Sequence, residues 1–230
     1  MWQAQVEQEG FAIVRAVLAK DQISSAVRLI ESPGAFDEPG RGGTRDVLNH
    51  LPELRVLADC AAVRLIVQQV LGSDAFVVRA TLFDKTPDAN WKVPWHQDLT
   101  IAVKERRETG GYEPWSTKAA VVHVQPPSDV LERMITVRLH LDDCGETNGA
   151  LRVMPGSHRL GRIDQNTVNE HVNERRSVVC AAQAGDALVM RPLLLHASSA
   201  SSHPSHRRVL HFDYAVGELS GGLAWRMRQF

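Results

Sequence analysis

The sequence predicts a mainly β fold, an antiparallel sandwich or barrel, with helices gathered in its N-terminal third. Three observations predict it. The length of 230 residues fits one all-β domain, because such domains often reach roughly 200–250 residues. Hydrophobic residues make up 43% of the chain, which is enough for a core. From residue 75 onward, short extended segments recur with turn clusters between them, as in sandwiches and barrels.

The N-terminal third is predicted to be helical around one short strand. The β-branched run over residues 11–17 predicts that strand. Asp21 follows as a candidate N-cap, with apolar residues at helical spacing behind it. Residues 33–46 hold four glycines and two prolines and are predicted to form a loop. A second helix is predicted over residues 63–70, ending at Gly72.

The remaining chain is predicted to consist mainly of strands. Apolar and polar residues alternate over residues 76–83, which is the two-residue repeat of a strand. Between two predicted strands lies the charged segment 104–118, which contains Tyr112 and Trp115. It is predicted to be either a lid over a substrate or a solvated surface loop. Further extended segments are predicted at 93–102, 119–124, 134–141, 150–154, 177–182, 187–190, 193–198 and 207–214.

Composition excludes several classes of protein. With 26 Lys and Arg against 27 Asp and Glu, the chain lacks the basic excess of a nucleic-acid binder. Its three cysteines form neither a disulfide framework nor a paired metal clip, which favours a reducing cytoplasm. There is no bilayer-spanning apolar run, signal peptide, nucleophile elbow, phosphate-binding loop or dinucleotide-binding glycine pattern. We therefore expect a cytoplasmic protein with a small-molecule partner, and the oligomeric state stays open.

Ten histidines provide candidate metal ligands, and the first candidate site is the motif Trp95-His-Gln-Asp98. On a strand, residues two apart project to the same side, so His96 and Asp98 would present an imidazole and a carboxylate together. These are two of the three ligands in a 2-His-1-carboxylate Fe(II) site, which leaves coordination positions free for substrate and oxygen. Taken alone the signal is weak, because most such pairs are polar surface residues.

A second constellation strengthens this prediction. The apolar run 188–195 ends at His196, which is either a core histidine bonded to backbone or a third ligand. If segments 193–198 and 207–214 are antiparallel neighbours, a basic residue lies beside His196 on the inner face. A buried arginine needs an anionic partner, and its planar fork suits a carboxylate. The pattern predicts a metal triad with a carboxylate-binding arginine.

Three features in this order along the chain together resemble the phytanoyl-CoA dioxygenase family of Fe(II)/2-oxoglutarate oxygenases. They are residues 95–98, the NGALRVMPGSH block at 148–158, and His196 with Arg207. The resemblance runs from about Phe11 to Tyr214. It implies a double-stranded β-helix, or cupin-like jelly roll, with flanking N-terminal helices. It also implies Fe(II), 2-oxoglutarate as cosubstrate, and O2. We expect a single domain over 1–230, with a helical third at about 1–74 and a jelly-roll core at about 75–215.

The resemblance also implies roles for individual residues. Arg207 would hold the distal carboxylate of 2-oxoglutarate, and Arg208 is the alternative if the register shifts by one. Ser198 and Lys85 match family positions that contact the cosubstrate. The implied iron ligands and catalytic residues are His96, Asp98 and His196.

Two features bear on the reaction. Many family members have a tryptophan on the strand before the Asn-Gly block, where this chain has Arg138. Arg138 and His140 share one strand face, which points either into the pocket, as we expect, or to solvent. There Arg138 would help to bind an anionic cosubstrate or substrate. The halogenating relatives replace the carboxylate ligand by a small residue, so an intact Asp98 favours hydroxylation over halogenation.

The expected reaction is hydroxylation of an unactivated C–H bond in a small molecule, with release of succinate and CO2. One alternative is a zinc hydrolase with the same ligands, but no general base accompanies the motif. The other is a non-catalytic jelly roll, which would be expected to have lost one of the ligands. His50 is left unassigned. The other histidines are expected to be structural (His158), solvated (His171, His203, His206), or in the core or lining the pocket (His123, His211).

Overall fold

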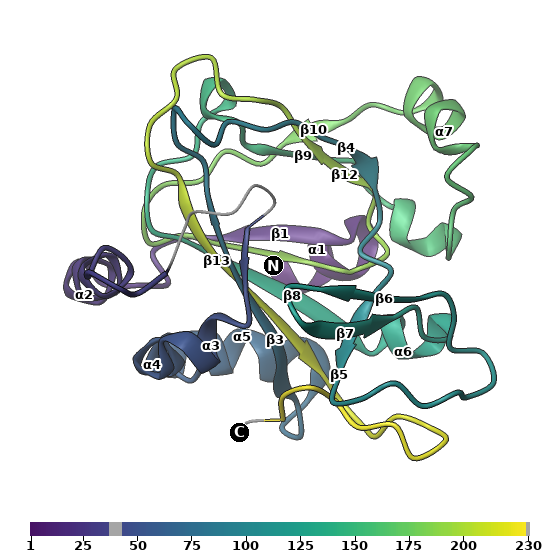
Figure 1. Ribbon diagram of the computed structural model, residues 1–230. Coiled ribbons are helices and arrows are strands. Elements are labelled where there is room, and N and C mark those ends of the chain that lie inside the picture. The colour runs from purple at the N-terminus through teal and green to yellow at the C-terminus, as the bar shows by residue number, and fades with distance from the viewer. Residues whose placement is uncertain (37–42, 229–230) are drawn as a thin grey trace.

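The protein, as a computed structural model, is a jelly roll built from antiparallel sheets with helices on its outside (Figure 1). The structure describes residues 1–36 and 43–228. A six-stranded sheet has the order β1-β11-β8-β13-β3-β2, and a four-stranded sheet the order β10-β9-β12-β4. A third sheet, β5-β7-β6, extends the molecule at one end. The predicted fold class is therefore confirmed.

The strands of the six-stranded sheet come from distant parts of the chain. They are β1 Phe11–Val14, β2 Thr44–Arg45, β3 Phe76–Asp84, β8 Met134–His140, β11 Ala187–Met190 and β13 Arg208–Ala215. The other strands are β4 Val93–His96, β5 Ile101–Val103, β6 Trp115–Lys118, β7 Val121–Val124, β9 Leu151–Val153, β10 Val178–Val179 and β12 His196–Ser198.

The helices are mostly short. They are α1 Trp2–Glu9, α2 Lys20–Ile30, α3 Val47–His50, α4 Arg55–Ala58, α5 Ala61–Leu71, α6 Ser128–Glu132 and α7 Val168–Glu174, with 3₁₀ turns at Pro52–Leu54, Glu146–Asn148 and Ser157–Leu160. The predicted cap of α2 was wrong: the helix begins after Ala19, whose N–H donates to the Gln22 side chain at 2.9 Å. Asp21 instead places its charge in the first turn, where it complements the helix dipole.

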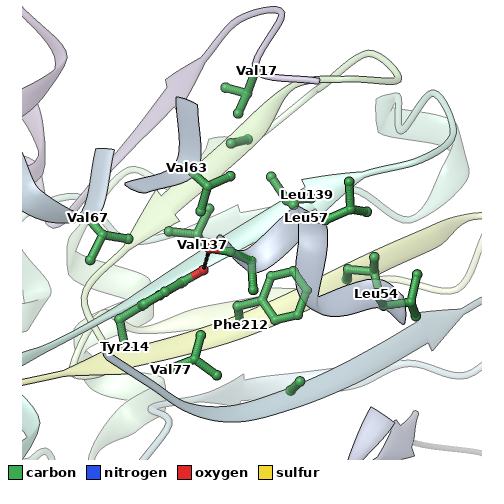
Figure 2. Close-up of a cluster of buried hydrophobic side chains, with 14 of the residues drawn as sticks. Val17, Leu54, Leu57, Val63, Val67, Val77, Val137, Leu139, Phe212 and Tyr214 are labelled. Carbon is green, nitrogen blue, oxygen red and sulfur yellow. Dashed lines mark hydrogen bonds between the residues drawn. The ribbon is translucent and has the colours of Figure 1, made fainter. Parts of the chain in front are cut away.

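Strand alternation gives the six-stranded sheet two different faces. The outer face is apolar, and the main hydrophobic core lies between it and helices from the N-terminal third. Figure 2 shows Phe212 and Tyr214 of β13 beside Val77 and Val137, with helical side chains packed against them. The Tyr214 hydroxyl donates to the carbonyl of Ala58 at 2.8 Å, which ties the end of α4 to the sheet.

The inner face of the same sheet is polar although it is buried. Neighbours in register across β3, β13 and β8 include Thr81 beside His211 and His211 beside Arg138. Residues directly opposite in antiparallel strands project to the same face. This face looks toward the four-stranded sheet, so the space between the two sheets is where charged side chains meet.

Two predictions about strands need correction. The expected strand 93–102 is two strands in different sheets, β4 and β5, because the Asp98 N–H donates to Pro192 instead of continuing a ladder. Segments 193–198 and 207–214 are not neighbours: β12 pairs with β4 and β9, whereas β13 pairs with β3 and β8. Apolar patterning predicts which face of a strand is buried but does not identify its partner strand.

The segment 104–118 was also only partly a loop. Its last four residues form β6, which pairs with β7. Tyr112 is buried and packs in a second core cluster with Leu219 and Trp225. The bulk of this aromatic side chain holds the segment against the C-terminal residues, so the loop is anchored rather than a free surface excursion. Within the described residues, no helix combines the length and the apolar character needed to cross a bilayer.

Candidate metal centre

The three residues that the sequence singles out as metal ligands come together between the sheets. His96 ends β4 and lies directly opposite His196 at the start of β12, and their ring centroids are 4.2 Å apart. Asp98 lies just past β4, with Oδ1 at 3.9 Å from His96 Nε2 and Oδ2 at 3.7 Å from His196 Nε2. One ligand atom from each residue lies within 4.8 Å of the others, which is close enough for a single ion.

Backbone hydrogen bonds set the tautomer of both histidines. Nδ1 of His96 donates to the carbonyl of Pro94 at 2.9 Å, and Nδ1 of His196 donates to the carbonyl of Leu194 at 2.9 Å. Because a carbonyl only accepts, each Nδ1 carries the proton, and each Nε2 keeps a lone pair directed at the Asp98 side. Hydrogen bonds of this kind, from the ring nitrogen that does not face the metal, orient the imidazole ligands of metal sites.

The charge state also suits a cation. Burial lowers the pKa of His196 to about 4, although the negative charge of Asp98 acts to raise it. The ring is therefore neutral at ordinary pH. Burial alone would raise the pKa of Asp98, yet the surrounding histidines and Arg79 hold it below its usual value, so the carboxylate is ionised. Its Oδ2 is buried without a hydrogen-bond partner. A neutral His196 ring and an ionised carboxylate with a free oxygen fit a divalent metal.

Three cations lie buried near these ligands, in the space between the two sheets. Lys85, Arg207 and Arg138 are 1%, 3% and 5% exposed. Within residues 1–36 and 43–228, none of their side chains is paired with a carboxylate. Burial, followed by the charge of Arg207, lowers the pKa of Lys85 to about 8 and that of Arg138 to about 10. Because buried charges without partners are costly, this cluster fits an anionic ligand.

Gly149 shapes the floor of this cationic pocket. Its carbonyl accepts from Nη1 of Arg207 and, at 3.0 Å, from Oγ of Ser198. Lys85 Nζ in turn donates to Ser198 Oγ at 2.7 Å. Gly149 has φ of 66°, and a Cβ there would lie 2.8 Å from the Ser199 carbonyl, so a larger residue would disturb these contacts. The Asn-Gly block of the sequence thus brings backbone close to Arg207.

The two consecutive arginines at the start of β13 point to opposite sides. Arg208 lies on the outer face, where it forms ion pairs with Asp142, at 2.7 Å, and with Glu31. Arg207 lies on the inner side, and its Nε is buried without a partner. Alternation along the strand explains the difference. Of the two candidates for carboxylate binding, only Arg207 has donors free for a ligand in the cavity.

The inner face also carries a hydrogen-bonded chain that the sequence did not predict. Arg138 Nη1 donates to His211 Nδ1 at 2.7 Å, and His211 Nε2 donates to Asp213 at 3.1 Å. Asp213 also accepts from Thr136 Oγ1 at 2.6 Å and forms an ion pair with Arg79. The available signal was a set of charged residues at alternate positions of two otherwise apolar strands.

The other histidines have varied surroundings. His123 and His140 are buried, as expected for residues of the core or the pocket. Both ring nitrogens of His140 lack partners. His158 donates from Nε2 to the Glu7 carbonyl at 3.2 Å, a structural role as predicted. His206 is exposed, as expected, and also contacts Asp84 at 2.8 Å. The expectation for His171 was wrong, because it lies half-buried in α7 rather than in a solvated loop.

Comparison with known proteins identifies the family and the fold. The family model described as phytanoyl-CoA dioxygenase (PhyH) matches residues 6–209. A curated relative from Aspergillus calidoustus, the iron/alpha-ketoglutarate-dependent dioxygenase ausU, is 23% identical over 221 residues, which is 89% of this chain and 67% of the relative.

Solved structures share the fold. The alpha-ketoglutarate-dependent carbocyclase SnoK of nogalamycin biosynthesis has a TM-score of 0.71 at 17% identity, with 94% of this chain and 83% of that chain covered. The EctD structure from S. alaskensis with 2-oxoglutarate and 5-hydroxyectoine has a TM-score of 0.72 at 19% identity, with 95% and 77% covered. At these identities the likeness shows the architecture alone.

Proposed function

The chain belongs to the phytanoyl-CoA dioxygenase family, and from this premise we propose that it hydroxylates an unactivated C–H bond of a small molecule. It is an Fe(II)/2-oxoglutarate-dependent dioxygenase, with Fe(II) as metal, 2-oxoglutarate as cosubstrate and O2 as oxidant. The observation that carries the proposal is the triad of His96, Asp98 and His196 beside a pocket of unpaired cations. Membership of this family excludes the zinc-hydrolase and non-catalytic alternatives.

The metal ligands proposed are the two Nε2 atoms of His96 and His196 and the carboxylate of Asp98. This set presents one side of the ion to the protein and leaves other positions for cosubstrate and oxygen. When bound, the iron with 2-oxoglutarate supplies the oxidation of the C–H bond, with succinate and CO2 as coproducts. The protein fixes the ligand tautomers in advance through the Pro94 and Leu194 carbonyls.

The cosubstrate pocket proposed is formed by Arg207, Lys85, Ser198 and Arg138. Arg207 and Lys85 neutralise the distal carboxylate, and the Ser198 hydroxyl holds Lys85 in place. Arg138 lies within electrostatic reach of both Arg207 and Asp98 and would add to the positive charge that holds the cosubstrate. Charge-assisted bonds in a buried site are the stronger kind, and this pocket offers several.

The retained carboxylate supports hydroxylation in preference to halogenation. A halogenating enzyme of this type needs a coordination position for chloride, and here Asp98 supplies a ligand with an oxygen that has no other partner. Hydroxylation balances as one oxygen atom from O2 entering the product and the other entering succinate.

The test is anaerobic titration of Fe(II) and 2-oxoglutarate into the purified chain. We expect a visible metal-to-ligand charge-transfer band that disappears in His96→Ala. A matched control is His158→Ala, since His158 lies outside the site and contacts Glu7; its band should persist. A well-folded wild-type protein without the band would contradict the assignment. Succinate release during screening of small molecules then identifies the substrate class.

A further inference from the structure

A second group of positive charges, Arg45 and Lys118, lies within electrostatic reach of Asp98. Arg45 belongs to β2, where it is directly opposite Thr81 of β3. Thr81 is in turn opposite His211 on the inner face. Since opposed residues share a face, the register directs Arg45 to the inner, polar side of the sheet, at its edge. Burial, followed by the charge of Arg79, lowers the pKa of Arg45.

Lys118 approaches the same place from the three-stranded sheet. It lies opposite Val121, and His123 follows on the same face two residues later. Val121, His123, Arg45 and Arg79 line a narrow gap between the two sheets, and Lys118 lies beside this gap rather than in its lining. Both Arg45 and Lys118 lie within electrostatic reach of Asp98. The two sheets therefore each place one cation within electrostatic reach of Asp98, and we call the region beside Arg45 and Lys118 the mouth of the site.

The neighbouring cations are already engaged, whereas these two are not. Arg79 pairs with Asp213 and donates to the Thr100 carbonyl at 2.9 Å. Arg226 pairs with Asp46 at 2.8 Å. Over the described ranges, no hydrogen bond or ion pair of the Arg45 or Lys118 side chain is present. Arg45 is half-buried, so leaving it without an anion costs free energy.

The charges of the loaded site do not supply that anion. This step rests on the proposed function. Bound Fe(II), Asp98 and 2-oxoglutarate together carry one net negative charge, and the buried cations Lys85, Arg138 and Arg207 already exceed it. The field at the mouth thus stays positive. The pKa of His123 is consistent with this positive field. Burial lowers that pKa to about 4, and the charges of Arg79, Arg45 and Lys118 lower it further, whereas the hydrogen bond to the Val121 carbonyl acts in the opposite direction.

We propose that Arg45 and Lys118 bind an anionic group of the primary substrate, a carboxylate or a phosphate, and so orient the substrate toward the metal. An arginine fork and a flexible ammonium are suited to such oxygens. The proposal narrows the substrate class to anionic small molecules. Neutral analogues, such as the methyl ester of a carboxylic acid substrate, lack the negative charge that Arg45 and Lys118 would bind, so they should bind more weakly.

The test uses the full chain loaded with Mn(II), which is paramagnetic and replaces Fe(II) without redox chemistry, at saturating 2-oxoglutarate. Inorganic phosphate and acetate are the probes, and nuclear relaxation of the phosphorus and of the methyl protons reports their approach to the metal. We expect a saturable enhancement for at least one probe. The preferred probe distinguishes a phosphate from a carboxylate substrate.

Variants make the test specific. Arg45→Gln and Lys118→Gln should each weaken probe binding roughly ten-fold, as expected for loss of a charged hydrogen bond. Arg176→Gln and Lys104→Gln, at exposed positions, should leave it unchanged. The Fe(II)–2-oxoglutarate band should be kept in all four variants. Its absence from wild type would sink the proposed function, whereas its presence with unaltered probe binding would sink only the anion site.

Two further results would overturn the inference. One is displacement of the probe by 2-oxoglutarate, because the anion would then occupy the metal or the cosubstrate pocket. The other is tighter probe binding in a variant with Asp37→Asn and Glu38→Gln. These two acids belong to residues 37–42, outside the described residues. Tighter binding would mean that the chain itself provides the anion for Arg45.

Discussion

Arg138 donates a hydrogen bond from Nη1 to Nδ1 of His211 at 2.7 Å, in the buried space between the two sheets. A guanidinium only donates, so Nδ1 of His211 must be unprotonated and Nε2 must carry the proton that it donates to Asp213 at 3.1 Å. Asp213 thereby sets the tautomer that lets His211 accept from Arg138. The Arg138 Nε remains buried without a partner, available to an anion.

The first prediction concerns this pair. Arg138→Met should raise the Kd for 2-oxoglutarate about ten-fold or more, because a charged hydrogen bond in a buried site is lost. Metal affinity, measured separately with Mn(II), should change little. His211→Leu should give a smaller increase, since Arg138 then loses its orientation, whereas His211→Asn keeps an acceptor near Nδ1 and should retain most affinity. Titration of the charge-transfer band measures each Kd, and an unchanged Kd in Arg138→Met would contradict the role.

Much of this site could be predicted from local sequence because its residues occur in recognisable spacings. His96 and Asp98 are two residues apart, and the distance in sequence from His196 to Arg207 matches the family. Both histidines end up opposite one another because β4 and β12 pair antiparallel. The alternation of β8 also indicated a shared face for Arg138 and His140, and that face is buried.

The remaining features depend on contacts between distant strands, which a single sequence does not encode locally. The neighbour of His196 comes from β4 and not from the strand after Arg207, because strand pairing in a jelly roll follows crossovers rather than chain order. Arg45 lies in a glycine-rich segment whose composition suggested only a loop. Its proximity to Asp98 arises from the pairing of β2 with the edge of β3, a pair of strands some thirty residues apart in sequence.

The second prediction uses the adjacent arginines as a matched pair. Arg207→Leu should weaken 2-oxoglutarate binding on the order of a hundred-fold, because the distal carboxylate loses its charged partner. Arg208→Leu should leave the Kd unchanged and lower the free energy of unfolding instead, since it leaves Asp142 without its ion pair. Binding titration and denaturant unfolding on the same two variants separate the effects. Reversed results would mean that Arg208 faces the cosubstrate.

The third prediction concerns metal binding and stability. Mn(II) at about one hundred times its Kd should stabilise the fold by about 2.7 kcal/mol, which raises Tm by roughly 5–10 °C for a chain of this size. Chelation with EDTA should reverse the shift. In Asp98→Ala the shift should vanish, while Asp88→Ala, a change outside the triad, should keep it.

The metal-free proteins provide an independent check of the same site. Asp98 Oδ2 has no hydrogen-bond partner in the folded protein, and a buried oxygen left unsatisfied costs stability. Metal-free Asp98→Ala should therefore be at least as stable as the metal-free wild type. A marked loss of stability would show that Asp98 serves the fold rather than the metal.

The fourth prediction is a pH dependence of stability that arises from His140. Burial lowers the pKa of His140 to about 3, and the positive charges of Arg138 and Arg207 act in the same direction. The negative charges of Asp186 and Asp142 oppose this shift only in part. In the unfolded chain this histidine takes up a proton below about pH 6.5, whereas in the folded protein it remains neutral. Its contribution to stability is thus complete above about pH 6.5 and is lost as the pH falls toward 3.

The measurement compares wild type with His140→Leu, which fills similar space and removes two ring nitrogens that have no partners. Between about pH 7 and about pH 5.5, the free energy of unfolding of wild type should fall by roughly 1 kcal/mol more than that of the variant. Other acids and histidines titrate in both proteins, so the difference between the two curves isolates His140. Parallel curves would mean that His140 gains a proton, a solvent path or a partner in the folded state.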